Sequence, residues 1–224
     1  MKKKKTAEPD KQIEADERNI VAVDEAYKEA GFEDRMYLFW EKYSTVIIAL
    51  IAATFVGIIL YFTMLFLAER REAAIQAEYA AAETTEQKET FARDHSGHRL
   101  AGAAALDIAD LRYNEEDYEQ AAEWYGLALE SLDGHPLYGR AGLGKSVSYI
   151  LLGRTEDAGR VLSDLADNEE VLLAVRMEAK YTLASLAFEA GDYDRVRSLA
   201  ESIEGEDMMG IWSGRARRLV DDIP

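Results

Sequence analysis

Residues 116–129 of this chain read EDYEQAAEWYGLAL, and a related pattern returns as GRTEDAGRVL at 153–162 and as GDYDRVRSLA at 191–200. One small or β-branched residue falls in register in all three segments, 37 and 38 residues apart: Ala121, Ala158 and Val196. A second set of small residues keeps the same two spacings upstream: Ala109, Ser146 and Ala184. Self-similarity at a fixed period indicates repeats that stack on one another.

Each repeat is typical of two helices joined by a short turn. The chain has only 3 prolines, and its alanine-rich segments alternate with turn residues such as Gly191-Asp192. We therefore predict an all-α fold with helices near 69–83, 85–95, 98–113, 117–131, 137–152, 155–166, 172–190, 193–203 and 208–221. Because one hairpin cannot bury its apolar face alone, repeats near 102–131, 139–166 and 177–203 should stack, closed by a C-terminal capping helix.

The spacing of the repeat matches a 34-residue tetratricopeptide unit with slightly longer connections. The small residue on the first helix lets the second helix approach, and the residue twelve positions later packs into that gap. An aromatic residue at the turn, Tyr118 or Tyr193, should seal the end of the hairpin. We predict a tetratricopeptide-like α-solenoid over residues 69–224.

A charge-free segment precedes the repeats, between Lys42 and Glu69. Its apolar part, Val46–Leu67, would be about 33 Å long as a helix, against a hydrocarbon thickness of about 30 Å. Aromatic residues crowd one end, as in an interfacial belt: Tyr37, Phe39, Trp40 and Tyr43. We predict a transmembrane helix at 46–68 that contacts membrane lipid. A cleaved signal peptide fits less well, since its apolar region is shorter and nearer the N-terminus.

The charge balance restricts the partners of the chain. It has 26 Lys plus Arg against 43 Asp plus Glu, a net charge of −17, which argues against nucleic acid. Residues 69–224 hold 17 of the basic and 32 of the acidic residues. The chain has no cysteine, which excludes disulfides and thiolate zinc sites.

Residues 1–45 are predicted to be a charged, partly disordered N-terminal tail. Within it, Ile20, Val23 and Tyr27 have helical spacing, so 13–30 forms either a short amphipathic helix or a weakly ordered segment. Basic residues within twenty positions of the span number three on each side, so the positive-inside rule does not decide the orientation. The Lys2–Lys5 run favours a cytoplasmic N-terminus, although it lies far from the span.

Two motifs resemble catalytic or metal sites. Residues 139–146 read GRAGLGKS, the pattern of a phosphate-binding loop, but residues 131–138 before it do not read as the strand that such a loop needs. We interpret these glycines as sites of close helix contact. His95, His98 and His135 are interpreted as exposed turn residues and not as metal ligands. With no nucleophile–base pair in the sequence, we expect neither an enzyme nor a cofactor.

One set of apolar residues suggests a binding surface. In the repeat register, seven residues of the first helices would line the concave face: Leu106, Tyr113, Leu143, Val147, Ile150, Leu151 and Phe188. We predict a groove for apolar peptide segments there. Two alternatives stay open, namely ordinary packing between neighbouring helices and coverage by the C-terminal helix that carries Ile211, Trp212 and Leu219.

The whole arrangement resembles a known family. Residues 91–95 (FARDH) and 100–109 (LAGAAALDIA) are similar to the first helix pair in the periplasmic domain of the YfgM-type ancillary subunits of the SecYEG translocon. An acidic tail, one span and a tetratricopeptide-like domain follow the same order, over most of residues 36–203. Departures are the lack of a proline after the second helices, Lys145 at a normally apolar position, and a longer tail.

The resemblance implies an inner-membrane protein with a cytoplasmic N-terminus and a periplasmic domain. Its implied partners are Sec translocon subunits, periplasmic chaperones and unfolded client chains. The alternative function is a membrane-tethered scaffold for another envelope complex, including one whose domain lies in the cytosol.

Overall fold

The computed structural model describes residues 31–224, and within them it has nine helices and no strand, which confirms the all-α prediction. The chain divides into two compact units, Met1–Glu69 and Arg70–Pro224. The Lys2–Lys5 run and the amphipathic segment at 13–30 lie outside the described residues.

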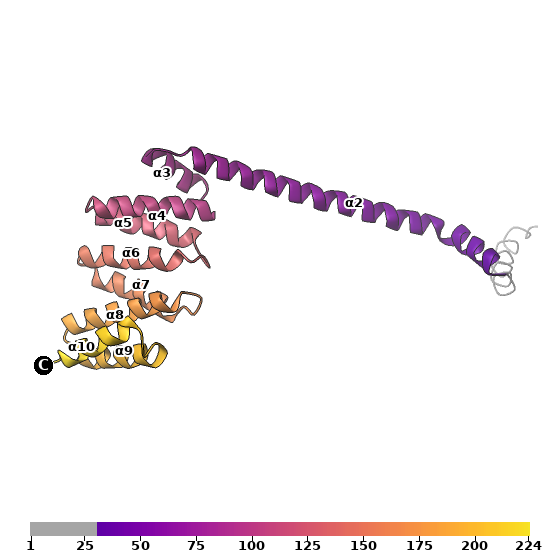
Figure 1. Cartoon of the computed structure of the whole chain (residues 1–224). Coiled ribbons are helices and arrows are strands. Elements are labelled where there is room, and N and C mark those ends of the chain that lie inside the picture. Colours follow the sequence, from indigo (N-terminus) through magenta and orange to yellow (C-terminus); the bar gives the residue numbers. More distant parts are fainter. Residues whose placement is uncertain (1–30) are drawn as a thin grey trace, which may run out of the picture. The chain divides into compact units, whose positions relative to one another are not determined.

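Helix α2 runs without interruption from Phe32 to Ala81, 50 residues in all (Figure 1). The helix begins before the apolar segment at 46–68 and continues through the range 69–83, which was predicted as a separate helix. The cause is local, because residues 32–81 contain no proline and only one glycine, Gly57. Inside the apolar part, the hydroxyls of Thr54 and Thr63 donate to the carbonyl oxygens of Leu50 and Ile59, at 2.8 and 2.7 Å.

The second unit is a series of helical hairpins (Figure 1). Its helices are α3 (Thr85–Asp94), α4 (Arg99–Asn114), α5 (Tyr118–Ser131), α6 (Tyr138–Leu151), α7 (Thr155–Asp167), α8 (Leu173–Glu189), α9 (Tyr193–Glu206) and α10 (Ile211–Asp221). Each begins and ends within three residues of its predicted range. The helix periodicity and the turn residues were therefore sufficient to place them.

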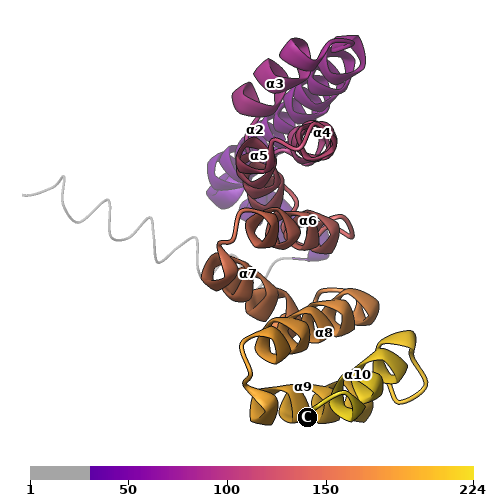
Figure 2. The same cartoon turned by 90° about the vertical axis from the view of Figure 1, so that its left-hand side faces the viewer.

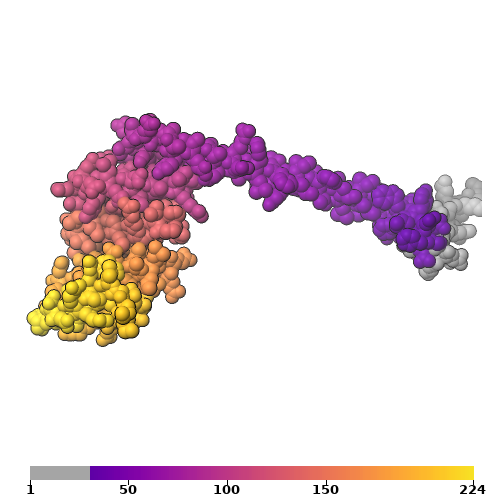
Figure 3. Space-filling view, in the orientation of Figure 1, coloured from indigo at the N-terminus to yellow at the C-terminus, as the bar shows by residue number. Residues whose placement is uncertain are grey.

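The hairpins give this unit two helical faces. Each helix packs mainly against the next one along the chain, and α10 packs against both α8 and α9. In Figure 2 the first helices of the hairpins, α4, α6 and α8, lie on one side, and the second helices, α5, α7 and α9, lie on the other. The space-filling view follows the chain in order from α4 to α10 along the stack (Figure 3).

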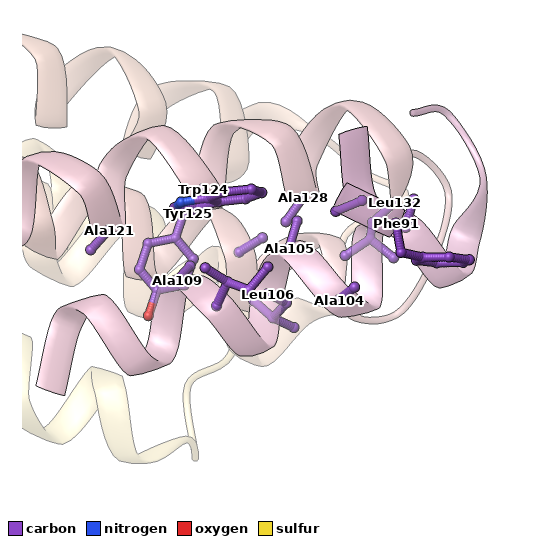
Figure 4. Close-up of a cluster of buried hydrophobic side chains, with 14 residues drawn as sticks. Phe91, Ala104, Ala105, Leu106, Ala109, Ala121, Trp124, Tyr125, Ala128 and Leu132 are labelled. Atoms are coloured by element: carbon purple, nitrogen blue, oxygen red, sulfur yellow. The ribbon is translucent and has the colours of Figure 1, made fainter. Parts of the chain in front are cut away.

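Small residues hold the hairpins together. All six residues that define the repeat register are fully buried, which confirms their predicted role: Ala109, Ser146, Ala184, Ala121, Ala158 and Val196. Large side chains fill the space around them, and Figure 4 shows Trp124, Tyr125 and Phe91 in the first core cluster. Close approach of small residues with interdigitated large ones gives the packing density of a protein interior.

The turns inside the hairpins also repeat. Glu116, Gly153 and Gly191 have φ of 63°, 73° and 77°, the left-handed conformation that ends a helix. Beside two of these turns, aromatic rings meet: Tyr113 with Tyr118 at 5.5 Å, and Phe188 with Tyr193 at 5.8 Å between centroids. The predicted aromatic seal is confirmed in both hairpins that carry it.

Candidate functional site

The apolar segment of α2 is exposed along its length. No residue of α2 is buried, and large apolar side chains point outwards all round it, with Phe55 63% and Ile59 62% exposed. Among the described helices, α2 is the one that is long and apolar enough to cross a membrane; a signal sequence near the N-terminus shares that composition. So much exposed apolar surface is unfavourable in water.

The predicted apolar groove does not form as a set. Leu106 is only 2% exposed and belongs to the first core cluster, so its assignment to a groove is wrong. It lies in the middle of α4 with almost no exposed surface, so a peptide cannot reach it. Tyr113 and Phe188 are half-buried against the turn rings described above, and Leu143 packs against the second core cluster.

The other three predicted residues remain partly exposed to solvent. Val147 and Ile150 are half-buried and Leu151 is 49% exposed. Trp212 of α10 contacts Tyr181 of α8, with ring centroids 5.3 Å apart, so the C-terminal helix does cover part of a first helix. A peptide surface at these three residues stays a prediction.

The segment that resembles a phosphate-binding loop lies inside α6. A Cβ placed at Gly142 would lie 2.8 Å from Cδ1 of Leu165, and one at Gly144 would lie 2.4 Å from Cζ of Tyr125. The interpretation of these two glycines as sites of close helix contact is confirmed. A phosphate-binding loop needs a strand, a turn and a helix, and one continuous helix occupies this stretch instead.

His95 and His98 lie in the turn between α3 and α4, as predicted, but their side chains are half-buried and not exposed. Nε2 of His95 lies 3.0 Å from Oε2 of Glu78, and Nε2 of His98 lies 3.0 Å from Oε2 of Glu72. Nδ1 of His98 also accepts the N–H of Leu100 and so caps α4. Both rings are half-buried and connect the end of α2 to the hairpins. Among the described residues, no three metal-ligating side chains gather.

A polar groove of about 360 Å³ lies on the second-helix face, between α5 and the start of α7, with α6 as its floor. We call it the α5–α6 groove. Its basic residues are Arg93 of α3, Lys145 of α6 and Arg154. Aromatic rings accompany each of them. The Arg93 guanidinium lies 4.8 Å from the ring centroid of Trp124, and Tyr149 lies between Lys145 and Arg154, at 5.9 and 4.5 Å.

Arg154 occupies the N-cap position of α7, where two other hairpins have an aspartate. Asp117 and Asp192 occupy the equivalent positions, and their carboxylates accept the N–H of Gln120 and Arg195. Arg154 has no acceptor to offer, and its positive charge is unfavourable at the N-terminus of a helix. Its Nε instead donates to Asp157 at 2.7 Å and its Nη1 to Glu119 at 3.1 Å. The hydrogen bond to Arg154 lowers the pKa of Asp157.

A second groove of about 660 Å³ lies one repeat further along the same face. We call it the α7–α8 groove. Its walls come from α7 and from the start of α9, and its floor comes from α8. In the repeat register, Leu183 replaces Lys145, Ala187 replaces Tyr149, and Asp192 replaces Arg154. The two grooves are equivalent in position and differ in chemistry.

The residues of the α5–α6 groove were not predicted as a site. Lys145 was identified only as a departure from the apolar pattern, while Arg93, Tyr149 and Arg154 were not singled out. A signal for Arg154 was present in the sequence, since a basic residue at the N-cap breaks the repeat. The convergence with Arg93 came from the packing of α3 and had no such signal.

Comparison with protein-family models, with curated proteins and with solved structures found no match for this chain.

Proposed function

We propose that this protein is a membrane-anchored, tetratricopeptide-like adaptor that binds other proteins through its helical hairpins. The observation that carries the proposal is the apolar part of α2, exposed on every side and continuous with the helix that leads into the hairpins. A lipid bilayer satisfies such a surface, and the Thr54 and Thr63 hydroxyls are already bonded to the helix backbone, as a bilayer requires. The hairpin stack offers extended grooves for partners.

As partners we propose Sec translocon subunits, periplasmic chaperones and emerging unfolded chains, with the N-terminus in the cytoplasm and the hairpins in the periplasm. Support comes from the order of the segments, which resembles that of the ancillary translocon subunits. The second candidate is a scaffold for another membrane complex with the hairpins in the cytosol. The tied count of basic residues beside the span favours neither orientation.

Topology reporters at residue 10 and at residue 224 of the full chain separate the two candidates. We expect a cytoplasmic signal at residue 10 and a periplasmic signal at residue 224. Co-purification with translocon subunits from solubilised membranes then tests the partner. A cytosolic signal from residue 224 contradicts the first candidate, and recovery of the full chain as a dispersed aqueous monomer contradicts the anchor itself.

A further inference from the structure

We propose that the α5–α6 groove docks an acidic, carboxylate-bearing peptide segment of a partner protein, with Lys145 as its main contact. This inference rests on the proposed adaptor function and names the chemistry of one of its binding surfaces. It concerns the second-helix face, and not the concave surface of first helices.

Lys145 is the residue that carries the inference. Among the lysines and arginines of residues 31–224, it is the one that is not exposed and forms no ion pair. The more deeply buried Lys180 shows the usual arrangement, since it bonds to Ser202 at 2.8 Å and pairs with Glu206. A partly desolvated ammonium without an anion is unfavourable, and a carboxylate from outside would relieve that cost.

The surroundings hold the Lys145 side chain in place. It crosses α5 at Gly126, where a Cβ would lie 3.2 Å from Nζ, and Tyr149 lies beside it. Glycine at this position therefore leaves room for the ammonium against the helix. A cation held in this way loses little conformational entropy when an anion binds.

Two arginines extend the basic surface. Arg93 lies over Trp124 and has no ion pair within the described chain, while Arg154 is fixed over Tyr149 by Glu119 and Asp157. At the positions of Lys145 and Arg154 the neighbouring repeat has Leu183 and Asp192, and the arginines of the α7–α8 groove, Arg160 and Arg195, lie at other positions. Departures from a local rule that converge on one surface are expected at functional sites.

The carboxylates of the groove do not neutralise Lys145. Glu119 is paired with Arg154, and Glu123 accepts a hydrogen bond from the neutral amide of Gln120 at 3.2 Å, which leaves its negative charge in place. Glu130 also lines the groove, and since neither Glu123 nor Glu130 has an ion pair in the described residues, both would repel an acidic segment at their own positions. The occupant therefore has its carboxylates towards Lys145, Arg93 and Arg154. Since the whole chain has a net charge of −17, unspecific attraction would favour a basic peptide instead.

The test uses the full chain in nanodiscs at physiological ionic strength. Three short peptides with a neutral dye, identical except for four positions that carry Glu, Gln or Lys, are compared by fluorescence anisotropy. We expect the Glu peptide to bind most tightly, and Lys145→Gln to weaken its binding at least about tenfold. The matched control is Arg195→Gln, the same loss of one charge at an exposed arginine of the α7–α8 groove, which should change the affinity less than about twofold.

Each of three results would overturn the proposal: equal binding of the Glu and Gln peptides, unchanged affinity of Lys145→Gln, or an equal loss in Arg195→Gln. Far-UV circular dichroism checks that both variants stay folded, and Lys145→Met gives a second removal of the charge. Failure of the proposed function shows elsewhere, in the topology reporters and in co-purification. The peptide can bind even if the translocon is not the partner of this protein. Conversely, the translocon can be the partner even if the peptide does not bind.

Discussion

The α5–α6 and α7–α8 grooves occupy the same place in successive repeats, yet the floor of the first carries Lys145 and Tyr149 while the floor of the second is apolar. Lys145 corresponds to Leu183, Tyr149 to Ala187, and Arg154 to Asp192. The buried residues of the register stay small in both repeats. The comparison teaches that a few buried positions set the shape of the hairpin, while the residues that line each groove are free to set its chemistry.

A second contrast lies in one pair of register positions, a residue of a second helix and a residue of the first helix that follows it. Tyr125 of α5 packs directly against Gly144 of α6, while the equivalent pair one repeat later is Leu162 and Thr182. The Tyr125 hydroxyl donates to Asp110 at 2.7 Å, and burial raises the pKa of this phenol. In both pairs the larger side chain lies on the second helix and the smaller one on the first helix.

The largest effect on stability is expected from Leu183→Lys, which places a lysine in the α7–α8 groove at the position equivalent to Lys145. Leu183 is 6% exposed and belongs to the second core cluster. Leu183→Lys should lower the free energy of unfolding by about 3–5 kcal/mol, because it removes apolar packing and buries an unpaired charge. Urea unfolding of the full chain in detergent, followed by circular dichroism, measures this loss. Leu183→Met is the control, and equal stability of the two variants would show that the position tolerates charge as position 145 does.

Next in size is Gly144→Ala, which adds a Cβ 2.4 Å from the ring of Tyr125. We expect a loss of about 1–3 kcal/mol, since the ring is buried and cannot move away. Gly159→Ala is the matched control, because nothing lies within 4 Å of its Cβ position and it lines the other groove. It should be stabilising by up to about 1 kcal/mol through helix propensity. Thermal unfolding distinguishes the two, and a stabilised Gly144→Ala would contradict the close packing of Gly144 against Tyr125.

Lys145→Leu makes the α5–α6 groove resemble its neighbour. We expect the free energy of unfolding to rise by up to about 1 kcal/mol, because a half-buried unpaired ammonium is replaced by an apolar side chain. Urea unfolding measures the change, with Arg195→Leu as the exposed counterpart. A clear loss of stability would mean that Lys145 contributes to folding and would remove the reason to assign it a partner.

The smallest effect concerns the loss of stability at low pH. The folded pKa of Asp157 is lowered from its ordinary value of 3.8, first by the hydrogen bond from Arg154. A lowered pKa stabilises the fold above the unfolded pKa, and this contribution is lost as pH falls through the folded value. Asp157→Asn should therefore lose slightly less stability between pH 5 and pH 3 than the parent chain, by thermal unfolding. An equal loss in both would mean that the ion pair with Arg154 does not contribute.

Much of the fold could be predicted because its determinants are local. Helix periodicity and turn residues placed α3–α10 within three residues, and the repeat register identified Ala121, Ala158 and Val196 as core. The continuity of α2 was missed because the change from apolar to charged composition resembles a boundary, although nothing in the backbone breaks the helix there. Leu106 was placed on the wrong surface because periodicity identifies an apolar face without telling which neighbour covers it.

The sequence by itself therefore determined the helices, the repeat and the apolar segment, since hydrogen bonding within a helix and burial of one face depend on residues close along the chain. Tertiary structure alone decided which charged side chains share a groove. Arg93, Lys145 and Arg154 are separated by up to 61 positions in the sequence, and only the packing of α3, α5 and α6 brings them to one surface. Whether one of these cations forms an ion pair depends on the distances between side chains that are far apart in the sequence. No local sequence pattern encodes those distances.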